Sequence, residues 1–131
     1  MDAPLRPLHV LLADDEAMLR LAIRLTLEDR GHRVTEAPDA DRALVLARAG
    51  GFDLAILDVN MPGDGLRLLA RLLDEAILPG RILMLTADVA RWATREELER
   101  RGIPWLAKPF DFGELTRTLE RMADEGSAPA G

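Results

Sequence analysis

At 131 residues the chain has the length of one ordinary domain, and its 48% of hydrophobic residues are enough to form a core. The lack of cysteine excludes disulfides and thiolate sites, and two histidines cannot build an imidazole cage, so any metal site must consist of oxygen ligands. A net charge of −6 argues against direct nucleic-acid binding. Without an apolar run of roughly 20 residues or a signal peptide, we expect a cytoplasmic domain with no membrane contact.

Five short apolar runs are expected to form strands, at residues 8–13, 34–37, 54–57, 82–85 and 103–106. The first, third and fourth runs are almost continuously aliphatic, which is typical of strands covered on both faces in a parallel sheet. The second run is short and polar, and Pro104 in the fifth cannot donate a hydrogen bond to a neighbouring strand. The second and fifth strands are therefore expected at the sheet edges.

The segments between these runs have the periodicity of amphipathic helices. In the first helix the apolar stripe is Leu19, Ile23 and Leu27, and the stripe expected to face outward is Arg20, Arg24 and Glu28. The second helix is expected to end at Gly50 and Gly51. In the last helix Phe112, Leu115, Leu119 and Met122 form the apolar stripe, and Asp111 and Glu114 are spaced like a capping box.

Regular alternation of strand and helix predicts an α/β fold with a doubly wound, five-stranded parallel sheet and helices on both faces. With the polar strands at the edges, the expected strand order is 2-1-3-4-5, which is flavodoxin-like. We expect one domain over residues 1–125, and residues 126–131 as a flexible tail or the start of a linker. In such a sheet the functional crevice lies at the carboxyl ends of the strands, between the first and third.

Polar residues occur where four of these strands end. Asp14 and Asp15 follow the first strand, Asp58 the third, Thr86 the fourth and Lys108 the fifth. Carboxylates about 4 Å apart repel each other by roughly 4 kcal/mol at an effective dielectric constant near 20, so protons or a cation must neutralise them. A cluster of oxygen ligands suits Mg²⁺.

Each residue also has a simpler interpretation when it is considered singly. Asp14 or Asp15 could cap the first helix, and Asp58 could introduce a turn. Thr86 could cap the next helix, and Lys108 could be solvated. The coincidence of all of them at one sheet edge favours a site. Lys108 is also the only lysine among 17 basic residues, which suggests a specific need for an ammonium group, although an arginine-biased composition and chance would give the same count.

These residues carry a resemblance to a known family. From Leu8 to about Met122 the sequence resembles the receiver domain of bacterial two-component response regulators. The matching features are Asp14-Asp15, the run from Leu57 to Pro62, Leu85-Thr86-Ala87 and Lys108-Pro109-Phe110. The resemblance implies that Asp58 accepts a phosphoryl group from a sensor histidine kinase or a histidine phosphotransfer protein.

The resemblance also implies roles for the surrounding residues. Asp15 and Asp58 would bind Mg²⁺ directly, Asn60 through its backbone carbonyl and Asp14 through water. Around the phosphoryl group, the Thr86 hydroxyl, the Ala87 amide and Lys108 would supply hydrogen bonds and charge, and the backbone of Asn60 would adjoin it. The peptide between Lys108 and Pro109 would be cis. Thr86 and Trp105 would form the switch that responds to phosphorylation, although Trp105 could equally be fixed packing.

On this basis the expected function is a phosphoacceptor switch rather than an enzyme. Its downstream protein target would bind the fourth helix, which is expected to carry Trp92, together with the fifth strand and fifth helix, and the chain would be a monomer or a phosphorylation-dependent dimer. Two alternatives remain open: a degenerate receiver that binds partners without phosphorylation, and a receiver fragment of a hybrid histidine kinase. In one departure from the family, only Gly63 and Asp64 separate Pro62 from Gly65, one residue fewer than usual, which leaves the start of the third helix uncertain.

Overall fold

The computed structural model describes residues 6–78, 81–87 and 92–127, and these form an alternating α/β fold. The strands and helices, in chain order, are β1 His9–Ala13, α1 Ala17–Asp29, β2 Arg33–Ala37, α2 Ala40–Ala49, β3 Leu54–Asp58, α3 Gly65–Asp74, β4 Ile82–Thr86, α4 Trp92–Arg100, β5 Trp105–Ala107 and α5 Phe112–Ser127. The strands are parallel and lie in the order β2-β1-β3-β4-β5. The predicted fold class and strand order are confirmed.

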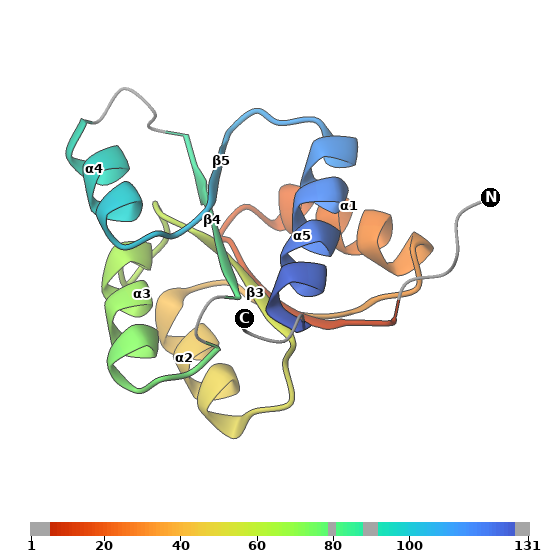
Figure 1. Cartoon of the computed structure of the whole chain (residues 1–131), viewed down its shortest axis with the longest axis horizontal. Helices are drawn as coiled ribbons and strands as arrows, with labels where there is room; N and C mark the ends of the chain where they lie inside the picture. Colours follow the sequence, from red (N-terminus) through yellow and green to blue (C-terminus); the bar gives the residue numbers. More distant parts are fainter. Residues whose placement is uncertain (1–5, 79–80, 88–91, 128–131) are drawn as a thin grey trace.

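The sheet lies between two layers of helices (Figure 1) and separates two clusters of buried hydrophobic side chains. Helices α1 and α5 cover one face, and α2, α3 and α4 cover the other. Side chains alternate across each strand, so neighbouring residues enter different layers: Leu12 and Leu54 face α1 and α5, while Leu11 and Leu57 face α2 and α3. All five residues of β3 and of β4 are buried, as expected for central strands.

The helix ends explain how the chain turns between layers. The carboxylate of Asp39 caps α2 by accepting from Arg42 N at 2.8 Å, and Gly50, with φ +84°, ends that helix as predicted. At the start of α5, Asp111 Oδ1 accepts from Gly113 N at 2.6 Å and from Glu114 N at 3.4 Å. Asp111 therefore acts as the predicted N-cap.

Several predicted boundaries differ from the structure. Strand β5 starts at Trp105, two residues later than expected, because Pro104 contributes its carbonyl to Met84 N but has no N–H to donate. Helix α5 continues through Ser127, two residues beyond the expected end of the domain, and the rest of the predicted tail, residues 128–131, lies outside the described residues. Within the described part of the chain, no helix has the length and apolar composition needed to cross a bilayer.

An ion-pair cluster joins α2 to the end of α3. Glu75 lies 2.6 Å from Arg48 Nη2 and 3.2 Å from Arg71 Nη2. The hydrogen bond from Arg48 is the main cause that lowers the pKa of Glu75 from 4.5 to about 2, and Arg71 adds to it. The charged form of Glu75 is therefore favoured in the folded protein.

We expect Glu75→Gln to lower stability near neutral pH but progressively less in acid. Because the folded-state pKa of Glu75 is depressed, its contribution is present above pH 4.5 and is lost as the pH falls towards about 2. Urea unfolding of both proteins over a pH series would measure this convergence. The exposed Glu125 on α5 provides a control substitution, and a constant difference between wild type and Glu75→Gln at all pH values would contradict the expectation.

Candidate functional site

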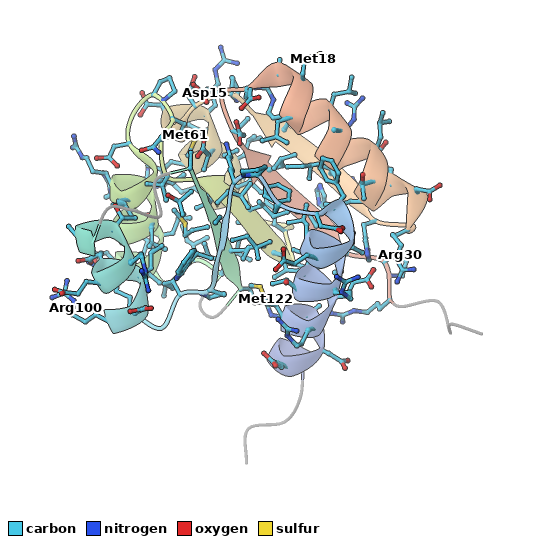
Figure 2. The ribbon with its side chains drawn as sticks, turned by 90° about the horizontal axis from the view of Figure 1, so that it is seen from above. Asp15, Met18, Arg30, Met61, Arg100 and Met122 are labelled. Atoms are coloured by element: carbon cyan, nitrogen blue, oxygen red, sulfur yellow. The ribbon has the colours of Figure 1, made fainter. Side chains whose placement is uncertain are left out.

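The carboxyl ends of the parallel strands bring the predicted polar residues to one edge of the sheet. Ala13 is paired with Leu57, Asp58 with Leu85 and Thr86 with Ala107. Strands β1, β3, β4 and β5 therefore end at nearly the same level of the sheet. Strand β1 lies between β2 and β3, which makes the β1/β3 boundary the predicted switch point. In Figure 2, Asp15 and Met61 lie towards one end of the molecule, and Met122 lies towards the other.

Three carboxylates meet at this edge, and we call Asp14, Asp15 and Asp58 the acidic pocket. Each offers an oxygen, and these oxygens all lie within 4.8 Å of one another. Asp14 is fully buried, Asp58 is only 3% exposed, and Asp15 is exposed to solvent. An open cluster of oxygen ligands with one exposed member fits a hard cation such as Mg²⁺, which keeps some of its waters.

Lys108 places a positive charge beside the carboxylates of the acidic pocket. Its Nζ lies 2.9 Å from Asp14 Oδ2 and 3.3 Å from Asp58 Oδ2, and its side chain is 15% exposed. Burial alone would lower the pKa of Lys108, but the bond to Asp14 and the charge of Asp58 outweigh it and raise the pKa. The interpretation of Lys108 as a solvated side chain is therefore wrong. The predicted cis peptide between Lys108 and Pro109 is confirmed.

Asp58 differs electrostatically from an ordinary surface carboxylate. Burial raises the pKa of Asp58, the neighbouring charge of Asp14 raises it further, and Lys108 and the Asn60 amide only partly oppose this shift. The ionised form of Asp58 is thus less favourable here than it would be in water. A cation bound in the acidic pocket would reduce that cost.

The loops around the pocket hold these carboxylates in defined positions. Asp14 Oδ1 accepts from Glu16 N at 2.9 Å, and Glu16, rather than Asp14 or Asp15, occupies the N-cap position of α1. Asp58 Oδ1 accepts from Asn60 N at 3.2 Å. Asp58 is therefore a turn residue, as its simpler interpretation proposed, and it also contacts Lys108. The interpretation of Asp14 or Asp15 as the cap of α1 is wrong.

The shortened loop after β3 is closed by close backbone contacts. Helix α3 starts at Gly65, where Asp64 Oδ1 accepts from Leu66 N at 2.9 Å, although Asp64 itself has φ +72°. A Cβ atom on Gly65 would overlap the Asp58 carbonyl oxygen and lie 2.8 Å from Val59 Cα. Helix α3 therefore begins directly after the shorter loop, with its first residue in close contact with the end of β3.

Of the remaining predicted residues, Thr86 and Ala87 lie at the same end of the sheet, whereas Trp105 begins β5. Thr86, the last residue of β4, is buried, and its carbonyl accepts from Lys108 N at 2.8 Å. Ala87 follows it and is exposed. Trp105 is partly buried against the layer of α2, α3 and α4, with Arg95 Cζ 5.9 Å from its ring centroid. The side chain of Trp92 lies outside the described residues.

Arg20 is a residue whose place the sequence did not reveal. It was expected to face outward, but its side chain is only 17% exposed, and Nη1 donates to the Asp14 carbonyl at 2.6 Å. Its position on the polar stripe of α1 suggested solvent. Only the fold shows that this part of α1 passes beside the end of β1.

We expect Lys108→Met to destabilise the metal-free protein by about 2 kcal/mol near neutral pH, because two buried carboxylates would lose their counter-charge. Lys108→Arg keeps a cation and should cost about 1 kcal/mol or less. Urea unfolding without divalent cations would measure both. Equal stability of wild type and Lys108→Met would show that Lys108 does not neutralise the pocket.

The fold and the site together define a doubly wound α/β protein with an acidic pocket at the switch point of its sheet. A family model, the response regulator receiver domain, matches residues 10–120. The chain belongs to this family.

Similar proteins agree with this assignment. The transcriptional regulatory protein CseB of Streptomyces avermitilis is 35% identical, over 94% of this chain and 58% of its own length. The chain spans about half the length of the curated relatives it matches. The receiver domain of the Francisella response regulator 1452 superposes with a TM-score of 0.83 at 27% identity, covering 92% of this chain and 99% of that one. For the receiver domain of the Pseudomonas aeruginosa sensor histidine kinase PA1611, which holds a coordinated magnesium ion, the TM-score is 0.80 at 29% identity, with 91% and 99% covered.

Proposed function

We propose that this receiver domain is a signalling switch that takes a phosphoryl group onto Asp58, with Mg²⁺ bound in the acidic pocket. The observation that carries the proposal is the juxtaposition of the nearly buried Asp58 carboxylate with two further carboxylates and, at 3.3 Å, Lys108. Such a site has a nucleophile, a cation and oxygen ligands for a metal. These are the components that phosphoryl transfer requires.

The donor would be the phosphohistidine of a sensor histidine kinase or of a phosphotransfer protein. A carboxylate oxygen of Asp58 attacks phosphorus and forms an O–P bond, the N–P bond of the donor breaks, and its electron pair returns to the imidazole nitrogen. Mg²⁺, when bound, offsets the negative charge of the carboxylates and the phosphoryl oxygens. Asp15, Asp58 and the Asn60 carbonyl would hold it directly, with Asp14 acting through water.

Around the product, the chain's own groups would bind the added charge. Lys108 already lies beside Asp58 and would pair with a phosphoryl oxygen as a compact ammonium group. The Thr86 hydroxyl and the Ala87 amide would donate to the same group. The added charge of about −1.5 to −2 would then bias Thr86 and Trp105 towards a second arrangement.

The output surface would be formed by α4, β5 and α5. Trp105, in β5, lies beside Arg95 of α4, whose Cζ is 5.9 Å from the ring centroid, so a change in Trp105 would affect α4 directly. A downstream protein would read this change. The domain itself would act as a phosphoacceptor and not as an enzyme with a substrate of its own.

Intact mass spectrometry after incubation with acetyl phosphate tests the proposal. We expect the wild type to gain one phosphoryl group only when Mg²⁺ is present, and peptide mapping to place it on Asp58. Chelation of Mg²⁺ should abolish the gain. An unchanged mass with Mg²⁺ and with a phosphorylated donor protein would contradict the proposal and leave a binding module that works without phosphorylation.

A further inference from the structure

The side chain of Arg20 crosses from α1 to the acidic pocket. It leaves the first turns of α1 and donates through Nη1 to the carbonyl oxygen of Asp14 at 2.6 Å. Its Nε donates to Glu36 Oε1 at 3.0 Å. One planar guanidinium group therefore connects the end of β1 with the neighbouring edge strand β2.

Glu36 holds this guanidinium in place. Its second carboxylate oxygen, Oε2, accepts from Arg24 Nη1 at 2.8 Å, so both oxygens are bound to arginines one helical turn apart on α1. The Glu36 side chain is 24% exposed, less than the 36% of Arg24. A charged pair that is partly withdrawn from water and fixed at both ends restricts Arg20 to one geometry.

The bonded carbonyl belongs to the peptide that joins Asp14 to Asp15. The N–H of Asp14 is also bound, since it donates to the Ala37 carbonyl at 3.2 Å. The backbone of Asp14 is thus held on both sides, by β2 and by Arg20. Because this peptide sets the directions in which the Asp14 and Asp15 side chains leave the chain, fixing it orients two of the three carboxylates of the acidic pocket.

We propose that Arg20, held by Glu36, is a positioning residue that orients Asp14 and Asp15 for cation binding. The inference rests on the proposed function of the acidic pocket. It differs from the role of Lys108, because the hydrogen bonds of Arg20 reach the pocket's backbone and Glu36, not the pocket's carboxylates. Loss of Arg20 should therefore weaken Mg²⁺ binding while it leaves every carboxylate and Lys108 present.

Arg24 offers a matched control. It shares Glu36 with Arg20 and lies on the same helix, but the described contacts of Arg24 go to Glu28 and Glu36, away from the pocket. We expect Arg20→Met to weaken Mg²⁺ binding about tenfold, the lower end of the range for residues that orient metal ligands. Arg24→Met should change it by about twofold or less. Arg20→Lys can donate well to only one of the two acceptors, so its affinity for Mg²⁺ should lie between those of Arg20→Met and Arg24→Met.

Isothermal titration with MgCl₂ measures the Kd of each variant, and thermal unfolding without Mg²⁺ measures its stability. A purely structural role would lower the melting temperature of Arg20→Met without changing its Kd for Mg²⁺. If Arg20→Met is too unstable to titrate, Arg20→Lys gives the same comparison against Arg24→Met. Equal Mg²⁺ affinity of the Arg20 variants and Arg24→Met overturns the inference, whereas failure of the wild type to bind Mg²⁺ overturns the proposed function itself.

Discussion

Asp58→Asn should abolish phosphorylation completely and, at the same time, stabilise the metal-free protein. The amide cannot act as the nucleophile that attacks phosphorus, so no phosphoryl group should be gained from acetyl phosphate or a phosphorylated donor. The same substitution removes a carboxylate whose pKa is raised by burial and by Asp14. Loss of this repulsion should raise the melting temperature by roughly 2–5 °C near neutral pH.

The pH dependence gives the sign of the second effect. Because the folded-state pKa of Asp58 is raised, Asp58 disfavours the folded state above that pKa, and the penalty disappears as the pH falls below the unfolded-state value. The stability difference between Asp58→Asn and wild type should therefore shrink in acid. Mg²⁺ should raise the melting temperature of wild type, and it should raise that of Asp58→Asn much less, since Asp58 is a proposed ligand.

Phosphorylation assays by intact mass and thermal unfolding with and without Mg²⁺ would test both effects. Asp74→Asn, at the exposed end of α3, is the control and should still be phosphorylated. Phosphorylation of Asp58→Asn would refute the assignment of the phosphoacceptor. A lower melting temperature for the metal-free Asp58→Asn protein would show that Asp58 is stabilised in the pocket by Lys108 more than it is opposed by Asp14.

Gly65→Ala should destabilise the protein by about 3 kcal/mol or more, because the added methyl group meets backbone atoms that cannot move aside. The methyl group would overlap the carbonyl oxygen of Asp58 and crowd Val59. To relieve this overlap, α3 must move away from β3 or the end of β3 must shift. We therefore expect a loss of about 10 °C in melting temperature and slower phosphorylation by acetyl phosphate.

Gly102→Ala separates this steric effect from ordinary backbone strain. Gly102 has φ +69°, and a methyl group added there would meet nothing within 4 Å beyond its neighbours in the chain, so alanine should cost only about 1 kcal/mol. Urea unfolding of the two variants measures the difference. If Gly65→Ala were no less stable than Gly102→Ala, the tight junction between β3 and α3 would not limit the fold.

Much of the fold follows from local patterns in the sequence. The aliphatic runs at β1, β3 and β4 and the polar or proline-containing runs at β2 and β5 predicted the sheet and its order. Asp14, Asp15, Asp58, Thr86 and Lys108 could be located because parallel strands place their carboxyl ends at one edge. These features depend on hydrophobic periodicity and chain order, which a sequence displays directly.

The contacts of the site depend on distances that the sequence does not contain. Lys108 pairs with Asp14 across 94 positions, and Arg20 turns away from solvent because β2 places Glu36 beside it. The start of α3 depends on the close approach of Gly65 to Asp58, which the residues of the loop do not indicate. Strand patterns and chain order thus establish which residues reach the sheet edge. Which of them touch follows from the folded arrangement alone, since hydrogen bonds and ion pairs form or fail over fractions of an ångström.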